Sequence, residues 1–170
     1  MSPRYLAAIL FVVCLVSCGD SGPTAPVLGA TAEMCTPAFC VTYPDDWEVV
    51  DSSDEFVSLR HPVDDAIAAT VSGINMELLV TTNGLTWPQT PDVALRSFWA
   101  LIDQGEAEIQ TTRPLVDGSV TSFGSFAEGR LWFRLIPIQG SEAIAVEVRA
   151  PNSSWSEHAD TITASVVPIP

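Results

Sequence analysis

Over most of the second half of the chain, hydrophobic and polar residues alternate with a period of two. The alternation is clearest where Ile144, Val146 and Val148 fall on one face and Glu147 and Arg149 fall on the other. This period is typical of strands in an antiparallel sheet that buries one face. The segments that share it are residues 106–112, 119–127, 130–138 and 142–149. We therefore expect four consecutive antiparallel strands here.

Extended structure is also expected nearer the N-terminus, where aromatic and β-branched residues alternate with polar ones. The turn signal P-D-D at residues 44–46 precedes Trp47, which is expected to re-enter the core. The segments expected as strands are residues 39–43, 47–50, 56–60 and 66–80. The last of these should bend at Gly73 and be followed by the turn signal Asn83-Gly84.

Two segments show the period of a helix instead. The first begins with a hydroxyl cap at Thr90 and proline at the first helical position, Pro91, and ends at Gly105. Its apolar positions are Leu95, Phe98, Trp99 and Ile102. The second begins with S-W-S-E at residues 154–157, which matches a capping box. Its apolar positions are Trp155, Ala159, Ile162 and Val166. This order predicts an α+β fold in which a mid-chain helix and a C-terminal helix cover an antiparallel sheet.

The start of the chain has the pattern of a bacterial lipoprotein signal. Arg4 precedes an uninterrupted apolar run over residues 6–16. This run is too short to cross a bilayer, which takes about 20 residues, but it is typical of a secretory signal. Residues 15–18, L-V-S-C, resemble a lipobox, so we expect Cys18 to be lipidated. The alternatives are a signal peptide cleaved without lipid and a buried core helix of a cytosolic protein.

Residues 19–34 are small, polar and interrupted by glycine and proline, which is typical of a flexible tether. Fully extended, this segment would reach about 50 Å. The expected organisation is a signal peptide over 1–17, a lipidated Cys18 with its tether over 18–34, and one α+β domain over 35–170. Such a protein lies on the extracytoplasmic face of the cell membrane, or at the outer membrane if the cell has one.

The chain is strongly acidic. Of 170 residues, 21 are acidic and seven are basic, all of them arginine, which gives a formal net charge of −14. Removal of residues 1–17, which hold one arginine and no acid, makes the charge −15. Such a field repels nucleic acid and anionic lipid headgroups. We therefore expect no nucleic-acid partner, and a membrane contact made by the lipid anchor.

Two of the four cysteines remain once Cys14 leaves with the signal and Cys18 takes the lipid. In an exported protein, the remaining pair, Cys35 and Cys40, is most simply a disulfide. Closing the short C-T-P-A-F-C loop would stabilise the domain by about 2 kcal/mol. A redox-active pair is more often C-x-x-C, so a structural bridge is expected.

The sequence offers no catalytic constellation, and we expect neither an enzyme nor a cofactor. The chain has two histidines, His61 and His158, and no G-x-S-x-G elbow, so both are expected as surface or partly packed imidazoles. Asp51, Asp54 and Glu55 in an acidic turn are a weak candidate for calcium. Their spacing does not match a dedicated calcium loop, and turn acids also bond to their own backbone.

The segment R-L-W-F-R offers a candidate surface for a partner. Alternation places Arg130, Trp132 and Arg134 on one face of a strand, and Trp and Arg are the residues most enriched at binding hot spots. The alternative is that Glu142 and Glu147 pair with these arginines across the strands while Trp132 lies under a helix.

The opening of the domain, F-C-V-T-Y-P-D-D-W over residues 39–47, resembles that of the PsbP-like fold. The resemblance extends over residues 39–167, where strands, a helix, a meander and a final helix follow in the same order. The group includes a subunit of the photosynthetic oxygen-evolving complex and LpqN-type lipoproteins of actinobacteria, and this chain is closest in type to the latter. Relatives often have glycine in place of Asp46.

The resemblance implies a binding or accessory module and brings no catalytic residues with it. We expect a lipid-anchored module that binds another protein of the cell envelope or the extracellular space. A carrier of a small ligand or lipid, using the space between sheet and helix, is the alternative. An enzyme of unrecognised type is the third hypothesis.

Overall fold

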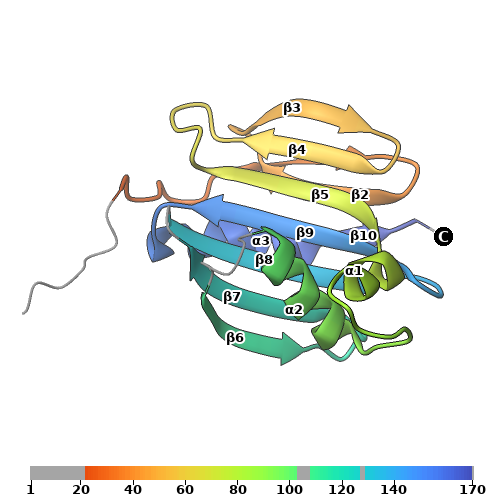
Figure 1. The fold of residues 1–170 in the computed structure, drawn as a ribbon. Coiled ribbons are helices and arrows are strands. Elements are labelled where there is room, and N and C mark those ends of the chain that lie inside the picture. The colour runs from red at the N-terminus through yellow and green to blue at the C-terminus, as the bar shows by residue number, and fades with distance from the viewer. Residues whose placement is uncertain (1–21, 103–107, 127–128, 170) are drawn as a thin grey trace, which may run out of the picture.

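A large antiparallel sheet organises the fold (Figure 1). The computed structural model describes residues 22–102, 108–126 and 129–169. The sheet has seven strands in the order β3-β4-β5-β9-β8-β7-β6. In this order they are Glu48–Ser53, Phe56–Arg60, Ala68–Asn75, Glu142–Ala150, Gly129–Pro137, Val120–Phe126 and Glu108–Pro114. The four strands of this sheet that come last in the sequence, β6 to β9, form the predicted meander, which is confirmed.

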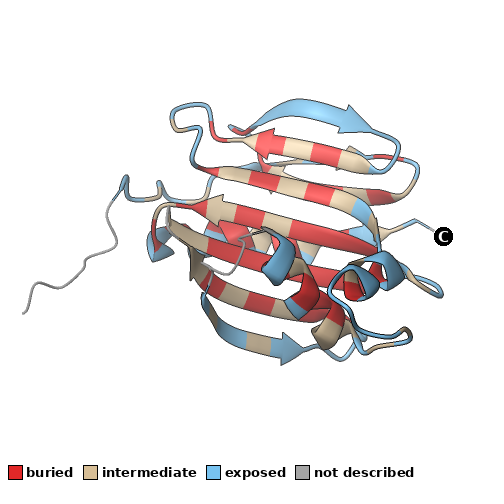
Figure 2. Ribbon diagram, in the orientation of Figure 1, coloured by how far each residue is buried: buried red, intermediate tan, exposed pale blue. Residues whose placement is uncertain are grey.

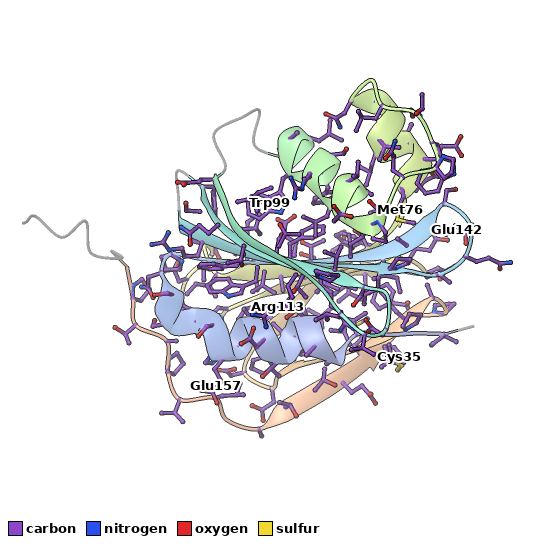
Figure 3. All side chains as sticks on the ribbon, turned by 90° about the horizontal axis from the view of Figure 1, so that it is seen from below. Cys35, Met76, Trp99, Arg113, Glu142 and Glu157 are labelled. Atoms are coloured by element: carbon purple, nitrogen blue, oxygen red, sulfur yellow. A yellow bond between two sulfur atoms is a disulfide. The ribbon has the colours of Figure 1, made fainter. Side chains whose placement is uncertain are left out.

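Helices and a smaller sheet cover the two faces of the large sheet. The smaller sheet has the order β1-β2-β10, formed by Thr31–Cys35, Phe39–Pro44 and Val167–Pro168. The helices are α1 (Met76–Thr82), α2 (Pro91–Ile102) and α3 (Ser156–Ser165), and the 3₁₀ turn η1 (Ser153–Trp155) precedes α3. Figure 3 shows α1 and α2 on one face, and α3 with the smaller sheet on the other. The predicted α+β architecture is confirmed. None of the described helices is long and apolar enough to cross a membrane.

The buried side chains form two cores, one on each face of the large sheet. The first core lies between this sheet, α3 and the smaller sheet, and it holds Trp47 and Trp132. The second core lies under α1 and α2, and it holds Trp99 and Phe133. Neighbours on β8 thus enter opposite cores, and this strand is buried without interruption from Leu131 to Ile136. On β4 only one face enters a core, so buried and half-buried residues alternate along it (Figure 2). Trp47 and Trp99 are buried as predicted, with 4% and 2% of their surface exposed.

The helix α1 replaces the end of a predicted strand. The period-two interpretation of residues 66–80 is correct only for β5, and the chain becomes helical at Met76. The reason is local: the Asn75 side chain caps the helix by accepting a hydrogen bond from the Leu78 N–H (3.0 Å). Met76 and Val80, one helical turn apart, then enter the second core. Gly73 remains inside β5.

The domain begins earlier than the predicted boundary at residue 35. Residues 31–35 form β1, which pairs with β2 in a hairpin where Cys35 lies opposite Cys40. The prediction that 18–34 is a flexible tether is therefore wrong for residues 31–34. The composition of this segment hid the strand, because Thr31 and Ala32 continue the run of small residues that precedes them.

The start of the C-terminal helix also differs from its prediction. The N-cap of α3 is Trp155, without a side-chain hydrogen bond, so Ser154 and Glu157 do not form a capping box. The Asn152 side chain instead accepts from the Ser154 N–H (3.0 Å) and starts η1. The Ser154 hydroxyl accepts from the N–H of Ala25 (2.9 Å), far away in the sequence.

Candidate functional site

Trp132, the centre of the predicted partner surface, is buried under α3. Only 8% of its surface is exposed, and its ring packs against Phe123 with 5.2 Å between the ring centres. Its remaining exposed edge borders a shallow hollow of about 250 Å³, which Arg113 and Asp160 also line. Partial desolvation beside this hollow raises the pKa of the Asp160 carboxyl, although the residue itself is exposed. The tryptophan therefore contributes to the first core.

Arg134 is buried to the same extent, and its guanidinium joins three parts of the fold. Nη1 donates to the carbonyl oxygens of Thr163 (2.9 Å) and Ala164 (3.2 Å) near the end of α3. Nε donates to the Ser119 hydroxyl (3.1 Å), and Nη2 donates to the Asp117 carboxylate (2.7 Å). Hydrogen bonds from Ser119, together with the Arg134 charge, lower the pKa of Asp117. A cation in this place also complements the helix dipole.

These contacts correct the interpretation of the R-L-W-F-R segment. Arg130 is half-buried, and Trp132 and Arg134 are buried, so the three do not form an exposed surface. The alternative that placed Trp132 under a helix is confirmed. Its proposed ion pairs differ, because Arg134 pairs with Asp117, and Glu147 pairs with Arg149 on its own strand.

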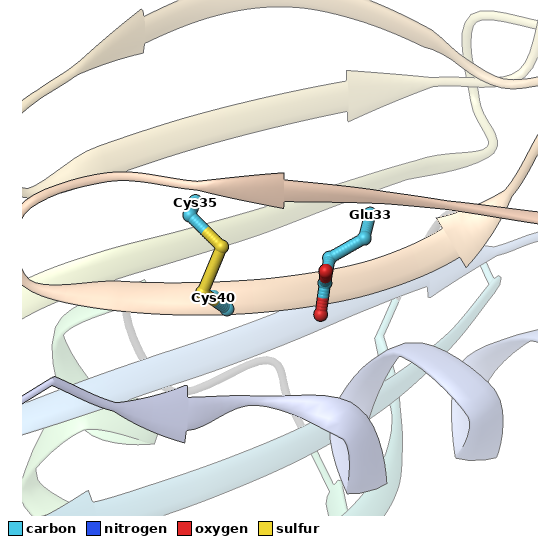
Figure 4. Close-up of side chains that lie close together, drawn as sticks. All are labelled: Glu33, Cys35 and Cys40. Carbon is cyan, nitrogen blue, oxygen red and sulfur yellow. A yellow bond between two sulfur atoms is a disulfide. The ribbon is translucent and has the colours of Figure 1, made fainter.

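The cysteine pair forms a disulfide, and the acidic turn forms no metal site. Cys35 and Cys40 are bonded, with 4.0 Å between their Cα atoms (Figure 4), which confirms the predicted bridge. Among the described residues, these two and Glu33 are the one group of three potential metal ligands that lie close together. Disulfide sulfurs offer no thiolate. The calcium candidates Asp51, Asp54 and Glu55 do not converge, and an Asp51 carboxylate oxygen accepts from the Ser52 N–H (2.8 Å).

The lipidation candidate, Cys18, lies outside the described residues.

Both histidines meet in one aromatic cluster of the first core, which the sequence did not predict. His61 lies near both Trp47 and Trp155, with 6.2 and 5.0 Å between ring centres, and the His158 ring lies 5.1 Å from that of Trp155. Nδ1 of His61 accepts from the Val63 N–H (3.3 Å). Nδ1 of His158 and Nε1 of Trp47 are buried without a hydrogen-bond partner. The distances between ring centres show a cluster in which both imidazoles pack against tryptophan rings.

We predict that the domain loses stability in mild acid because of His158. Burial lowers the pKa of its imidazole below 6.5; the charge of His61 also lowers it, and Asp46 and Glu157 act in the opposite direction. The folded chain therefore binds this proton less readily than the unfolded chain does. Its contribution is complete above the unfolded pKa and is lost as the pH falls below it. Thermal melts from about pH 8 to about pH 5 measure the loss. His158→Gln should reduce the pH dependence, and an unchanged dependence would contradict the assignment.

Half of the large sheet carries no described helix on its α2 side (Figure 1). The helix α2 contacts β7 and β8, and charged side chains occupy the same face on β4 and β9. On β4, a guanidinium nitrogen of Arg60 lies 3.5 Å from the Glu48 carboxylate and another lies 3.4 Å from Asp65. On β9, Arg149 pairs with Glu147. We refer to this region as the open half of the sheet.

An open pocket of about 350 Å³ lies in the open half and is the candidate functional site. It is lined by Asp65, Ala66, Ala68, Thr70, Phe126, Glu147 and Arg149. The Arg149 guanidinium lies 5.6 Å from the centre of the Phe126 ring, a cation–π contact. The volume is at the lower end for small-molecule sites. An aromatic ring beside charges of both signs suits a polar or charged group that enters from outside.

The sequence contained a partial signal for this pocket. Glu147 and Arg149 were placed on the face opposite Val146 and Val148, and the structure confirms that the valines enter the first core. Glu147 and Arg149 are charged, half-buried and adjacent on one face of β9. Such a pair indicates that this face is only partly covered by other elements. The partner strand adds Thr70, opposite Glu147 in the register, which no pattern in the sequence indicated.

No protein-family model matches the chain, and no curated protein matches its sequence. Its structure is similar to the solution structure of the cyanobacterial PsbP (CyanoP) from Synechocystis sp. PCC 6803, with a TM-score of 0.55 and 18% identity. The match covers 91% of this chain and 99% of that chain. A crystal structure from Bacteroides thetaiotaomicron matches with a TM-score of 0.47 and 12% identity, over 84% of this chain and 49% of that chain. The likeness to the cyanobacterial protein shows that this chain has a PsbP-like fold.

Proposed function

We propose that this protein is a lipid-anchored extracytoplasmic binding module, of the LpqN type, whose partner is another protein of the cell envelope. The observation that carries the proposal is the open half of the sheet with its charged pocket. Arginine and aromatic side chains are enriched at binding hot spots, and Arg149 and Phe126 lie together there. The edge strand β3, which is exposed at every residue, extends the same region.

The charges favour a partner with a basic contact surface. Around the pocket, the carboxylates of Glu48, Asp65 and Glu147 accompany the guanidinium groups of Arg60 and Arg149. Across the whole chain, acids exceed arginines threefold. Such a field accelerates the approach of a basic protein. A basic side chain entering the pocket would meet Glu147 and Asp65, which both line it.

We predict that Thr70→Trp abolishes capture of the partner from detergent-solubilised membranes. Thr70 lines the pocket and is half-buried in β5, so an indole at this position fills the space that the partner would enter. The control is Thr121→Trp, because Thr121 is a half-buried strand threonine that lines the hollow beside α3. Affinity purification followed by mass spectrometry measures capture. Equal capture by both variants would remove the pocket from the proposal.

The carrier hypothesis placed a ligand between the sheet and a helix. Under α2, side chains of the second core occupy that space, among them Leu95, Trp99 and Phe133. Nothing in this arrangement favours a carrier over a binding module. Native mass spectrometry of the purified protein distinguishes the two, since a carried lipid would add a discrete mass.

We predict that Cys18→Ala releases the protein from the membrane. The basis is the L-V-S-C sequence at residues 15–18, because only the cysteine thiol can carry the lipid. Phase separation in detergent should place the wild-type protein in the detergent phase and the variant in the aqueous phase. A Cys14→Ala control keeps the acceptor cysteine and should behave as the wild type. The lipoprotein proposal fails if the Cys18 variant stays in the detergent phase.

A further inference from the structure

The segment that precedes β1 is fastened to the start of η1. The Pro23 carbonyl oxygen accepts hydrogen bonds from Nε1 of Trp155 and from Nδ2 of Asn152, both at 3.0 Å. Next to it, the Ala25 N–H donates to the Ser154 hydroxyl. These contacts, made by residues 22–25 on residues 151–155, are called the N-terminal clip below. They replace the flexible connection that composition alone predicts for this part of the chain.

The clip has a specific requirement at Gly22. Its φ angle is +125°, which side-chain-bearing residues rarely adopt. A Cβ atom at this position would lie 2.5 Å from Cβ of Pro151, well inside van der Waals contact. The clip also supplies the acceptor for the indole N–H of Trp155, a residue with 1% of its surface exposed. Detachment would leave that buried donor without its partner, which is unfavourable, so the clip is expected to stay closed in the folded domain.

The clip and the candidate pocket lie at the same end of the sheet. Pro151 follows Arg149 of the pocket by two residues, and the loop that carries Asp65 reaches this end as well (Figure 1). The turn between β6 and β7, which carries Val116, lies at the opposite end.

We infer that the N-terminal clip holds the pocket end of the domain against the membrane and presents the pocket to the extracytoplasmic part of an integral membrane protein. This inference rests on the proposed lipidation of Cys18. Three residues separate Cys18 from Gly22, so the lipid-bearing residue lies within about 14 Å of the clip even when the chain is extended. A free tether over residues 19–34 would instead allow about 50 Å and any orientation.

The choice of partner follows from reach and charge. A pocket held this close to the bilayer is accessible to protein segments that emerge from the same membrane. Anionic headgroups are a poor occupant for it, because the domain carries a large negative charge and Asp65 and Glu147 line the pocket.

Fluorescence quenching on vesicles tests the orientation. The lipidated protein is reconstituted into phosphatidylcholine vesicles that contain a lipid-bound acceptor dye. A donor dye is placed at Val63→Cys, near the clip, or at Val116→Cys, at the far end; both valines are almost fully exposed. We expect the Val63 label to be quenched severalfold more strongly than the Val116 label. Gly22→Val should remove that difference, whereas Gly29→Val should keep it, because a Cβ at Gly29 meets nothing within 4 Å.

The outcomes separate this inference from the proposed function. Protein that fails to enter the vesicles contradicts the lipid anchor itself. Protein that enters them with equal quenching of the two labels overturns only the inference, as does a difference that survives Gly22→Val. The captured partner must also be an integral membrane protein, and capture of a soluble envelope protein alone would overturn the stated occupant.

Discussion

Replacing Trp99 with alanine is expected to lower the free energy of unfolding by about 3–5 kcal/mol, the range for removing a buried tryptophan. Trp99 is almost fully buried in the second core, and its Nε1 donates to the Ser122 hydroxyl at 2.7 Å. The strand β7 approaches this ring so closely that a Cβ atom at Gly124 would lie 2.7 Å from it. The cavity cannot close easily, since the sheet on one side and α2 on the other are held by their own hydrogen bonds.

Chemical denaturation followed by circular dichroism measures this loss. It is a large part of the 5–15 kcal/mol that typically stabilises a domain. Leu101→Ala in the same helix is the control, because Leu101 is exposed and its truncation should change stability by at most about 0.5 kcal/mol. Equal midpoints for the two variants would show that α2 presents a different face to the sheet.

Replacing Arg134 with alanine is expected to cost about 2–3 kcal/mol, the scale of hydrogen bonds that involve a charged group. The substitution removes the donor to two carbonyl oxygens near the end of α3 and to the Ser119 hydroxyl. It also removes the ion pair with Asp117, which contributes less because that carboxylate is half-exposed. We therefore expect a clear loss of stability even though the substituted residue is charged and not part of the apolar core.

The comparison with Arg134→Lys separates charge from geometry. Lysine keeps the charge near the end of α3 but lacks the planar fork that reaches several acceptors at once. We expect it to recover only part of the loss in thermal melts. Full recovery by lysine would show that charge alone matters, and an unchanged melting temperature in the alanine variant would contradict the buried network.

The sequence predicted the strands best where one face of each is consistently apolar. In β9, alternation placed Val146 and Val148 on one face, and both enter the first core. The helix α2 was equally predictable, because Pro91 and Trp99 mark its start and its buried face. The helix α1 was missed because it is short and its signal is a single capping residue, Asn75.

The candidate sites were less predictable because they depend on coverage by distant segments. Alternation placed Trp132 and Arg134 on the correct face of β8, but it could not show that α3 covers that face. The pocket beside Arg149 has the opposite origin, since α2 contacts β7 and β8 and leaves the other half of the same face uncovered by a described helix. Periodicity within a strand describes its two faces, and the identity of the layer above each face is a long-range property.

The smaller sheet brings the N-terminal and C-terminal segments of the domain together. Its central strand β2 pairs with β1 on one side and with β10 on the other, and the Ile169 N–H also donates to the Ala38 carbonyl oxygen at 2.8 Å. A chain that emerges N-terminus first, from a ribosome or an export channel, cannot complete this sheet until its last residues are free. The first core thus stays open to chaperones and proteases during synthesis, and closure of the domain is a late, non-local event.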